Sequence, residues 1–144
     1  MNCPSSDIVS IEAAGLSDGE KVKQLAMSFD LDCEDFSIHQ FYVAKSNTEI
    51  VGFGRLRKYS SCTEVATVGV IPEERYKGIG TAIVNELIKS GPKELFVTCV
   101  IPHFFERIGF ETVKHYPEVL RKKVDFCKLY DFTEDQIFVM KISK

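Results

Sequence analysis

The segment 68–82 constrains the chain most, because it reads as strand, loop and helix with two glycines at the helix start. Gly78 and Gly80 let the backbone approach a ligand closely, and the first amides of a helix point outward without partners inside the helix. The helix dipole adds positive potential at that end. Arg75, just before the glycines, can add a fixed charge and paired hydrogen bonds. The segment therefore predicts a site for an anionic phosphate group.

Two common phosphate-binding loops do not fit this segment. A Walker loop ends in Gly-Lys-Ser/Thr, and the segment has no such ending. A dinucleotide-binding fold needs a third glycine where Ile83 stands and an acidic residue about twenty positions further on. A tight turn without a ligand would also use Gly78 and Gly80, but the strand-to-helix context and Arg75 favour the phosphate site.

Length and composition limit the class of protein. A chain of 144 residues predicts one domain over 1–144, with 44% apolar and 27% charged residues. It has no apolar run that could cross a bilayer and no secretory signal, so we expect a cytoplasmic protein without a membrane partner. The net charge of −3 and the interleaved basic and acidic residues argue against nucleic acid. The five cysteines form no C-x-x-C pair, which predicts free thiols and no metal site.

Apolar spacing predicts the elements of the first half of the chain. Ser17 and Glu20 have the spacing of a capping box, and a helix is expected over 18–29 behind them. A short strand over 8–13 precedes it, and 30–40 is expected to be a loop or short helix. The pattern then changes to three consecutive antiparallel strands, expected over 41–44, 50–57 and 64–71.

Helices and strands alternate in the second half. A helix over 80–90 ends at Gly91, and the apolar run 95–100 predicts a buried strand that pairs near strand 64–71 after the helical crossover. The remaining elements are expected as a short helix over 102–108, a strand over 110–113, a helix over 117–128 and a last strand over 137–142.

Two motifs in order resemble one family. Arg75, Gly78 and Gly80 follow a strand that ends in an apolar residue and a proline, as in the Gln/Arg-x-x-Gly-x-Gly/Ala motif of the GCN5-related N-acetyltransferases, or GNAT family. The run from Phe104 to Phe110, an aromatic pair followed by Gly-Phe, matches a second feature of that family. The resemblance implies an α/β (α+β) GNAT fold, with a mixed central sheet of six to seven strands, an antiparallel N-terminal part and about four flanking helices.

The resemblance also implies a cofactor and a reaction. Acetyl-CoA would be the co-substrate, and its acetyl group would move to a primary amine of a small molecule by direct attack, without a covalent enzyme intermediate. The Val70 amide would polarise the thioester carbonyl. The cofactor-binding residues implied in this way are Val68, Gly69, Val70, Arg75, Tyr76, Lys77, Gly78, Ile79, Gly80, Thr81 and Phe105.

The acceptor amine must be neutral to attack. An α-amino group has a pKa of about 7.7 to 8.0, so about one-tenth of it is neutral at pH 7. A lysine side chain has a pKa of about 10.4, so a far smaller fraction of it is neutral. Glu64 lies six residues before Val70 on the same expected strand, where some family members hold a general base. Glu64 is therefore a candidate base, with an exposed strand carboxylate as the alternative.

Phe105 departs from the family pattern. Many members have a tyrosine there, whose hydroxyl protonates the leaving thiolate. Either the thiolate leaves unassisted, or Tyr76, Tyr116 or Cys99 donates the proton, and Tyr116 is carried with Glu64 as a candidate catalytic residue. Plain core packing is the alternative for the ring of Phe105.

The end of the chain loosely resembles the amino-acid acetyltransferases of the N-acetylglutamate-synthase type, which favours an amino acid as the acceptor. The residues that carry this likeness are Pro117, Lys123, Cys127 and Met140. Arg55, Arg57 and Lys58 either bind the acceptor's carboxylate or keep an edge strand soluble. The acceptor could instead be a polyamine, an antibiotic or a protein amine. A non-catalytic CoA-binding module is an alternative function, and a homodimer is an alternative to a monomer.

Overall fold

The computed structural model describes residues 9–144 and groups them into two compact units. Unit 1 comprises the chain up to Arg55 together with Thr67–Lys89, and unit 2 comprises Leu56–Ala66 together with Ser90–Lys144. Strands β3 and β4 contribute to both units. The prediction that 1–144 form one domain stays a prediction.

Unit 1 holds the first strands and the first two helices. Strand β1 pairs antiparallel with β2, and β2 pairs antiparallel with β3 with a register shift at Ala44 and Lys45. The bounds are β1 (Val9–Ala13), α1 (Gly19–Ser28), β2 (Phe41–Ser46), β3 (Glu49–Lys58), β4 (Thr63–Val70) and α2 (Ile79–Ser90). The expected strand over 8–13 is confirmed from Val9 onward, and its first residue lies outside the described part.

The helix predicted over 18–29 is present, but its start differs from the prediction. A 3-10 turn, Leu16–Asp18, leads directly into α1. The Gly15 amide donates to Asp18 Oδ2 at 2.8 Å, and the Asp18 amide donates to the Gly15 carbonyl at 3.0 Å. The capping box assigned to Ser17 and Glu20 is therefore wrong, because the reciprocal pair of hydrogen bonds forms two residues earlier in the chain.

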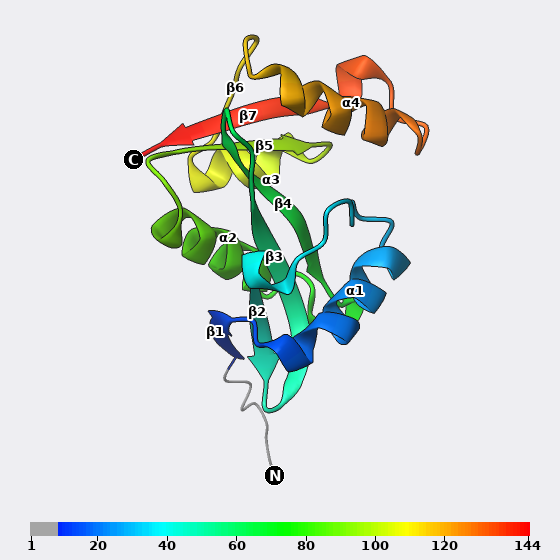
Figure 1. Cartoon of the computed structure of the whole chain (residues 1–144), viewed down its shortest axis with the longest axis vertical. Helices are drawn as coiled ribbons and strands as arrows, with labels where there is room; N and C mark the ends of the chain where they lie inside the picture. Colours follow the sequence, from blue (N-terminus) through cyan, green and yellow to red (C-terminus); the bar gives the residue numbers. More distant parts are fainter. Residues whose placement is uncertain (1–8) are drawn as a thin grey trace. The chain divides into compact units, whose positions relative to one another are not determined.

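The strands of unit 1 have a helix on each face. Figure 1 shows α1 and α2 on opposite sides of β3. On one face, Phe53 is wholly buried in a cluster with Val22 and Ala26 of α1. On the other face, Gly54 leaves room for α2, since a Cβ there would lie 2.9 Å from a methyl carbon of Ile83. Alternating residues of β3 thus bury both faces, as expected for a central strand.

Arg55, also on β3, is buried completely and fixes the loop between α1 and β2. All five of its N–H groups donate within unit 1. Its guanidinium nitrogens bond to the carbonyls of Asp32, Glu34 and Asp35, to Gln40 Oε1 and to Thr67 Oγ1 at 2.8 to 3.3 Å. The suggestion that Arg55 binds a substrate carboxylate, or serves solubility on an edge strand, is wrong, because its donors are used inside the fold and β3 lies between β2 and β4.

Thr67 interrupts the regular course of β4. Its φ of 52° is in the left-handed region, which is strained for a β-branched residue. Besides accepting from Arg55, its hydroxyl donates to the Asp32 carbonyl at 2.7 Å. Strained positions persist only where their surroundings hold them, and they cluster near functional sites. This one directly precedes Val68, the first of the predicted cofactor residues.

Unit 2 contains the rest of the sheet. Strand β4 pairs with β5 at Glu64 and Phe96, as the sequence predicts, and this pairing is parallel. Strands β5 and β6 each pair antiparallel with β7. The hydrogen-bonded order is β1-β2-β3-β4-β5-β7-β6, a mixed sheet of seven strands, which confirms the expected fold class. The bounds are β5 (Glu94–Cys99), α3 (Pro102–Ile108), β6 (Glu111–Thr112), α4 (Arg121–Lys128) and β7 (Phe138–Ser143).

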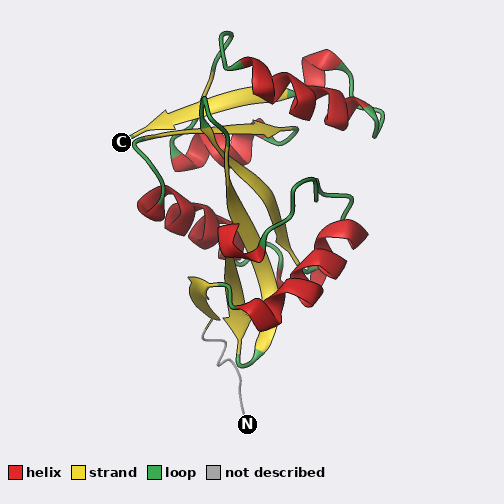
Figure 2. Ribbon diagram, in the orientation of Figure 1, coloured by secondary structure: helices red, strands yellow, loops and turns green. Residues whose placement is uncertain are grey.

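Helix α4 covers one face of unit 2 (Figure 2). Its Val124, with Leu120 just before it, packs on Phe96 of β5 and Val139 of β7. Strand β6 is shorter than the expected 110–113, because the Phe110 amide instead donates to the Phe105 carbonyl. Among residues 9–144, no helix has the length and apolar character needed to span a membrane.

Candidate functional site

The loop that joins β4 to α2 is open at its glycine. After a 3-10 turn, Pro72–Glu74, helix α2 begins at Ile79, one residue before the predicted start. Gly78 has a φ of +86°, and a Cβ built there would meet nothing within 4 Å. Glycine is needed for the backbone conformation, not to avoid a clash. The space beside Gly78, directly before the first amides of α2, is therefore open.

The side chains of this loop make contacts within unit 1 that shape it. Arg75 Nε donates to the Val70 carbonyl at 2.8 Å, and its guanidinium lies 5.3 Å from the centre of the Phe29 ring. Lys77 Nζ pairs with Glu74 Oε1 at 3.2 Å. Both cations are exposed, but their positions are set by neighbours within the loop and β4. Arg75 thus ties the loop to the end of β4.

Tyr76 behaves differently from its neighbours. It is fully exposed, and its φ of 66° places a bulky residue in the left-handed region. Tyr76 and nine other predicted cofactor residues all belong to unit 1. They lie on one continuous stretch, from β4 through the loop into α2.

Phe105, the eleventh predicted cofactor residue, lies in unit 2 and is only 4% exposed. Its ring makes edge-to-face contacts with Phe104 and Phe110, with ring centres 4.9 Å and 5.5 Å apart. These contacts account for the ring as core packing.

Glu64 is buried in unit 2, at 1% exposure. The Tyr59 hydroxyl donates to its Oε1 at 3.0 Å, and Lys123 Nζ of α4 lies 3.8 Å from its Oε2. The alternative that Glu64 is an exposed strand carboxylate is wrong, because its side chain is buried and Lys123 of α4 lies beside it. We call Glu64, Tyr59 and Lys123 the Glu64 cluster.

Because the Glu64–Lys123 ion pair is buried, its two charges depend strongly on each other. Charges taken out of water need close partners, since desolvation opposes ionisation and a nearby opposite charge favours it. Lys123 is 8% exposed, and the Arg57 guanidinium lies 5.0 Å from the centre of the Tyr59 ring. Arg57 is itself buried, so it does not serve solubility.

The sequence does not predict the partners of Glu64 as site residues. One signal was available: Leu120, Lys123, Val124 and Cys127 share one helical face, and a lysine on an otherwise apolar face needs an acidic partner. Tyr59 carries no such signal, because it lies between the expected strands 50–57 and 64–71.

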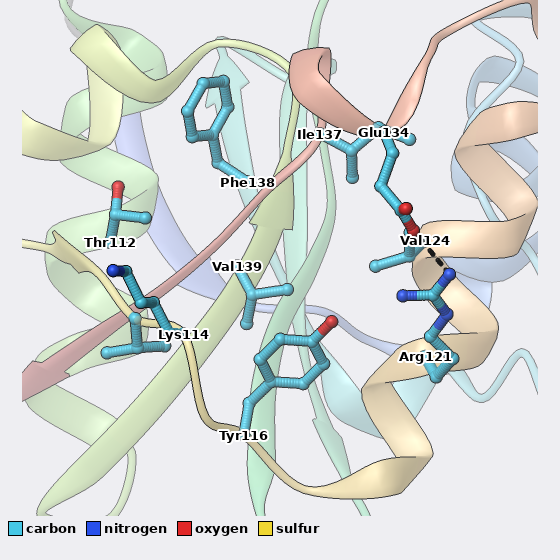
Figure 3. A pocket seen from close by; sticks show the side chains of 10 residues that line it. Thr112, Lys114, Tyr116, Arg121, Val124, Glu134, Ile137, Phe138 and Val139 are labelled. Atoms are coloured by element: carbon cyan, nitrogen blue, oxygen red, sulfur yellow. Dashed lines mark hydrogen bonds and ion pairs between the residues drawn. The ribbon is translucent and has the colours of Figure 1, made fainter.

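Tyr116 lines a separate pocket of unit 2, of about 390 Å³, between α4 and strands β6 and β7. Figure 3 shows Thr112 and Lys114 across this pocket from Arg121 and Glu134. Glu134 and, after it, Tyr116 raise the pKa of the Arg121 guanidinium by hydrogen bonding to it. Lys128 and Arg121 lower the pKa of Glu134. Glu64 is not among the described residues that line the pocket, so the structure does not bring the two predicted catalytic residues together there.

Cys99, another candidate proton donor, is also in unit 2. Burial raises the pKa of its thiol to about 11, and its Sγ–H contacts Met140 Sδ at 3.8 Å. The thiol is therefore protonated at neutral pH but buried. Within residues 9–144, no group of three or more His, Cys, Asp or Glu side chains is placed to hold a metal ion.

Comparisons with known proteins agree on the family. The model of the acetyltransferase (GNAT) domain matches residues 37–112. The chain is 27% identical over 97 residues to an uncharacterized N-acetyltransferase of Chlorobaculum tepidum, covering 62% of this chain and 63% of the relative. It is 30% identical over 103 residues to the amino-acid acetyltransferase of Mycobacterium tuberculosis, covering 66% of this chain and 59% of the relative. The chain thus spans about three-fifths of the length of these relatives.

A solved structure shares the fold. It is N-acetylglutamate synthase from Neisseria gonorrhoeae complexed with coenzyme A and N-acetyl-glutamate, with a TM-score of 0.77 and 19% identity over 99% of this chain and 36% of the other. The GNAT domain model alone covers more than half of the sequence and contains both motifs that resemble the family. The chain therefore belongs to the GNAT acetyltransferase family.

Proposed function

We propose that this protein is an N-acetyltransferase that moves the acetyl group of acetyl-CoA to the amine of a free amino acid. The observation that carries the proposal is the open loop at the start of α2, where Gly78 has a left-handed conformation and leaves the space above it empty. Membership of the GNAT family and the CoA in the Neisseria gonorrhoeae structure support it.

The loop is suited to a diphosphate. The amides from Lys77 to Thr81 lie at the start of a 12-residue helix, where the dipole stabilises negative charge. We propose that these amides hold the pyrophosphate and that pantetheine runs along Val68, Gly69 and Val70. Because Arg75 is anchored on the Val70 carbonyl, its main contribution is to fix the loop relative to β4.

Glu64 is the proposed proton acceptor. Lys123 favours its ionised form, in which the carboxylate can take a proton from the acceptor. The neutral amine then attacks the thioester carbonyl, the carbon–sulfur bond breaks, and the thiolate is protonated by the amine proton that remains to be lost. No tyrosine hydroxyl stands at Phe105, so the proposed leaving step needs no donor at that position.

An amino acid is the proposed acceptor because of the relatives. The Mycobacterium tuberculosis protein is named an amino-acid acetyltransferase, and the Neisseria gonorrhoeae structure contains N-acetyl-glutamate. The chain covers only part of each, so the acceptor is a proposal about this chain and not a transfer of their activity.

An acceptor screen tests the function. Loss of the thioester absorbance of acetyl-CoA is followed with a panel of free L-amino acids, polyamines, aminoglycosides and peptides. The proposal expects turnover with at least one amino acid, and a rate with Glu64→Gln that is lower by about 100-fold or more. Turnover with polyamines or peptides but no amino acid would contradict the acceptor class.

A CoA-binding module without turnover is the second candidate, and one observation favours it. The ring of Phe105 is packed into an aromatic cluster and offers no hydroxyl to a leaving thiolate. Calorimetric binding of CoA together with no thioester loss across the whole panel would establish this candidate.

A further inference from the structure

Glu64 is the proposed general base, but its carboxylate is almost completely shielded from solvent. Only 1% of the residue is exposed, so an amine that arrives from solvent meets other atoms first. A general base must lie within hydrogen-bond reach of the proton it takes, directly or through one intermediary. The buried position therefore calls for a group that connects Glu64 to the acceptor.

Tyr59 is placed to be that group. It is half-buried, and its hydroxyl donates to Glu64 Oε1 at 3.0 Å. A phenol donates one proton and accepts another through the same oxygen, so it can pass a proton on without net change.

Two further contacts hold Tyr59 in this position. The Arg57 guanidinium stacks over its ring, with 5.0 Å between the guanidinium carbon and the ring centre. The Tyr59 amide donates to the Cys62 carbonyl at 2.8 Å, which closes the turn between β3 and β4. The hydroxyl is thus directed at Glu64 by contacts on both the side chain and the main chain.

Lys123 completes the arrangement from α4. Its ammonium lies 3.8 Å from Glu64 Oε2, so Tyr59 and Lys123 contact different oxygens of the carboxylate. The positive charge favours the ionised carboxylate, which is the form that accepts a proton.

We propose that Tyr59 is a further catalytic residue that relays the acceptor's proton to Glu64. As one proton moves from the ammonium nitrogen of the acceptor to Tyr59 Oη, the phenolic proton moves to Glu64 Oε1. The amine becomes neutral, Glu64 becomes a carboxylic acid, and Tyr59 ends as it began. This inference rests on the proposed acetyl transfer and on Glu64 as its base.

A double-mutant cycle tests the relay with the amino acid that gives the highest rate in the screen. Tyr59→Phe keeps the ring and removes only the hydroxyl. If both residues act on one proton path, Tyr59→Phe and Glu64→Gln each lower kcat by about 100-fold, and the double variant is no slower than the slower single variant. Tyr130→Phe, which removes the hydroxyl of another tyrosine in unit 2, keeps the wild-type rate.

A solvent isotope experiment separates relay from packing. Two protons move together in the wild type, so kcat falls along a curve as the D₂O fraction rises, and the relation becomes linear in Tyr59→Phe. If Tyr59→Phe proves too unstable to assay, 3,5-difluorotyrosine at position 59, with its more acidic phenol, changes kcat and leaves KM unchanged.

The outcomes are distinguishable. A wild-type rate in Tyr59→Phe, or a double variant that loses the product of the two single effects, overturns the relay and leaves the acetyltransferase proposal standing. A wild-type protein that binds CoA without thioester loss overturns the proposed function, and the relay with it.

Discussion

The loop of unit 1 is formed by main-chain groups, whereas the Glu64 cluster of unit 2 is formed by side chains. The loop offers main-chain amides at an open surface, and its conformation depends on one glycine with a positive φ. The cluster consists of side chains from β4, α4 and the turn after β3, all shielded from water to a large degree. A site made of main chain leaves a glycine pattern in the sequence, whereas a site made of distant side chains leaves none.

The largest effect is expected from breaking the cluster. Lys123→Met leaves the Glu64 carboxylate buried without this cation, which should lower the free energy of unfolding by about 3 to 5 kcal/mol. Urea titration at neutral pH measures this, with Lys122→Met, at the exposed neighbouring position, as the matched control. The double variant Lys123→Met with Glu64→Gln should regain much of the loss. A single variant as stable as wild type would show that the pair is not what holds the two elements together.

An acidic substitution in the loop should change the affinity for CoA more than it changes stability. Gly80→Asp places a negative charge and bulk beside the proposed pyrophosphate site, so the Kd for CoA should rise at least about 100-fold, equivalent to about 2.8 kcal/mol. Isothermal calorimetry measures the Kd and circular dichroism checks the fold. Lys89→Asp introduces the same side chain in the last turn of α2 and should bind CoA as wild type does. Unchanged affinity in Gly80→Asp would refute the loop as the diphosphate site.

These two regions also mark what could be predicted from the sequence. The helix start at Gly78 and Gly80 and the antiparallel pairing of β2 with β3 follow from local patterns, and the structure has both. The place of β7 between β5 and β6 does not follow from them. The burial of Glu64 could not be read locally, because it depends on α4, nearly sixty residues later in the chain. The role of Arg55 cannot be predicted locally for the same reason, because its five acceptors lie on a loop, a 3-10 helix and another strand.

A smaller effect should separate the two glycines of the loop. Gly78→Ala forces a Cβ into a left-handed conformation and should lower the free energy of unfolding by about 1 to 2 kcal/mol, although there is space for the methyl group. Gly80→Ala lies inside α2 and should raise stability slightly, because alanine is the better helix former by about 1 kcal/mol. Thermal unfolding of both variants decides this, and equal shifts of the same sign would contradict the contrast.

The smallest effect is expected for a buried hydroxyl of unit 2 that, unlike Glu64 Oε1, has no hydrogen-bond partner among the described residues. Thr98 Oγ1 is buried and, among the described residues, has no hydrogen-bond partner. Thr98→Val keeps the shape and removes the hydroxyl, so the free energy of unfolding should rise by about 1 kcal/mol. Ser143→Ala at the exposed end of β7 serves as the comparison, with no shift expected. Destabilisation by Thr98→Val would mean that the hydroxyl is satisfied in solution.

The contacts of Arg55 have a consequence for how this protein can diversify. The guanidinium donates to the main-chain carbonyls of Asp32, Glu34 and Asp35, in the segment between α1 and β2. Every amino acid has such a carbonyl oxygen. The exposed Glu34 can therefore be exchanged in a mutant library without giving up these anchors, whereas Asp35, with a φ of 53°, stands in the left-handed region that favours Asp, Asn and Gly. A segment that is anchored through main-chain oxygens and carries an exchangeable side chain is what a selection for altered recognition requires.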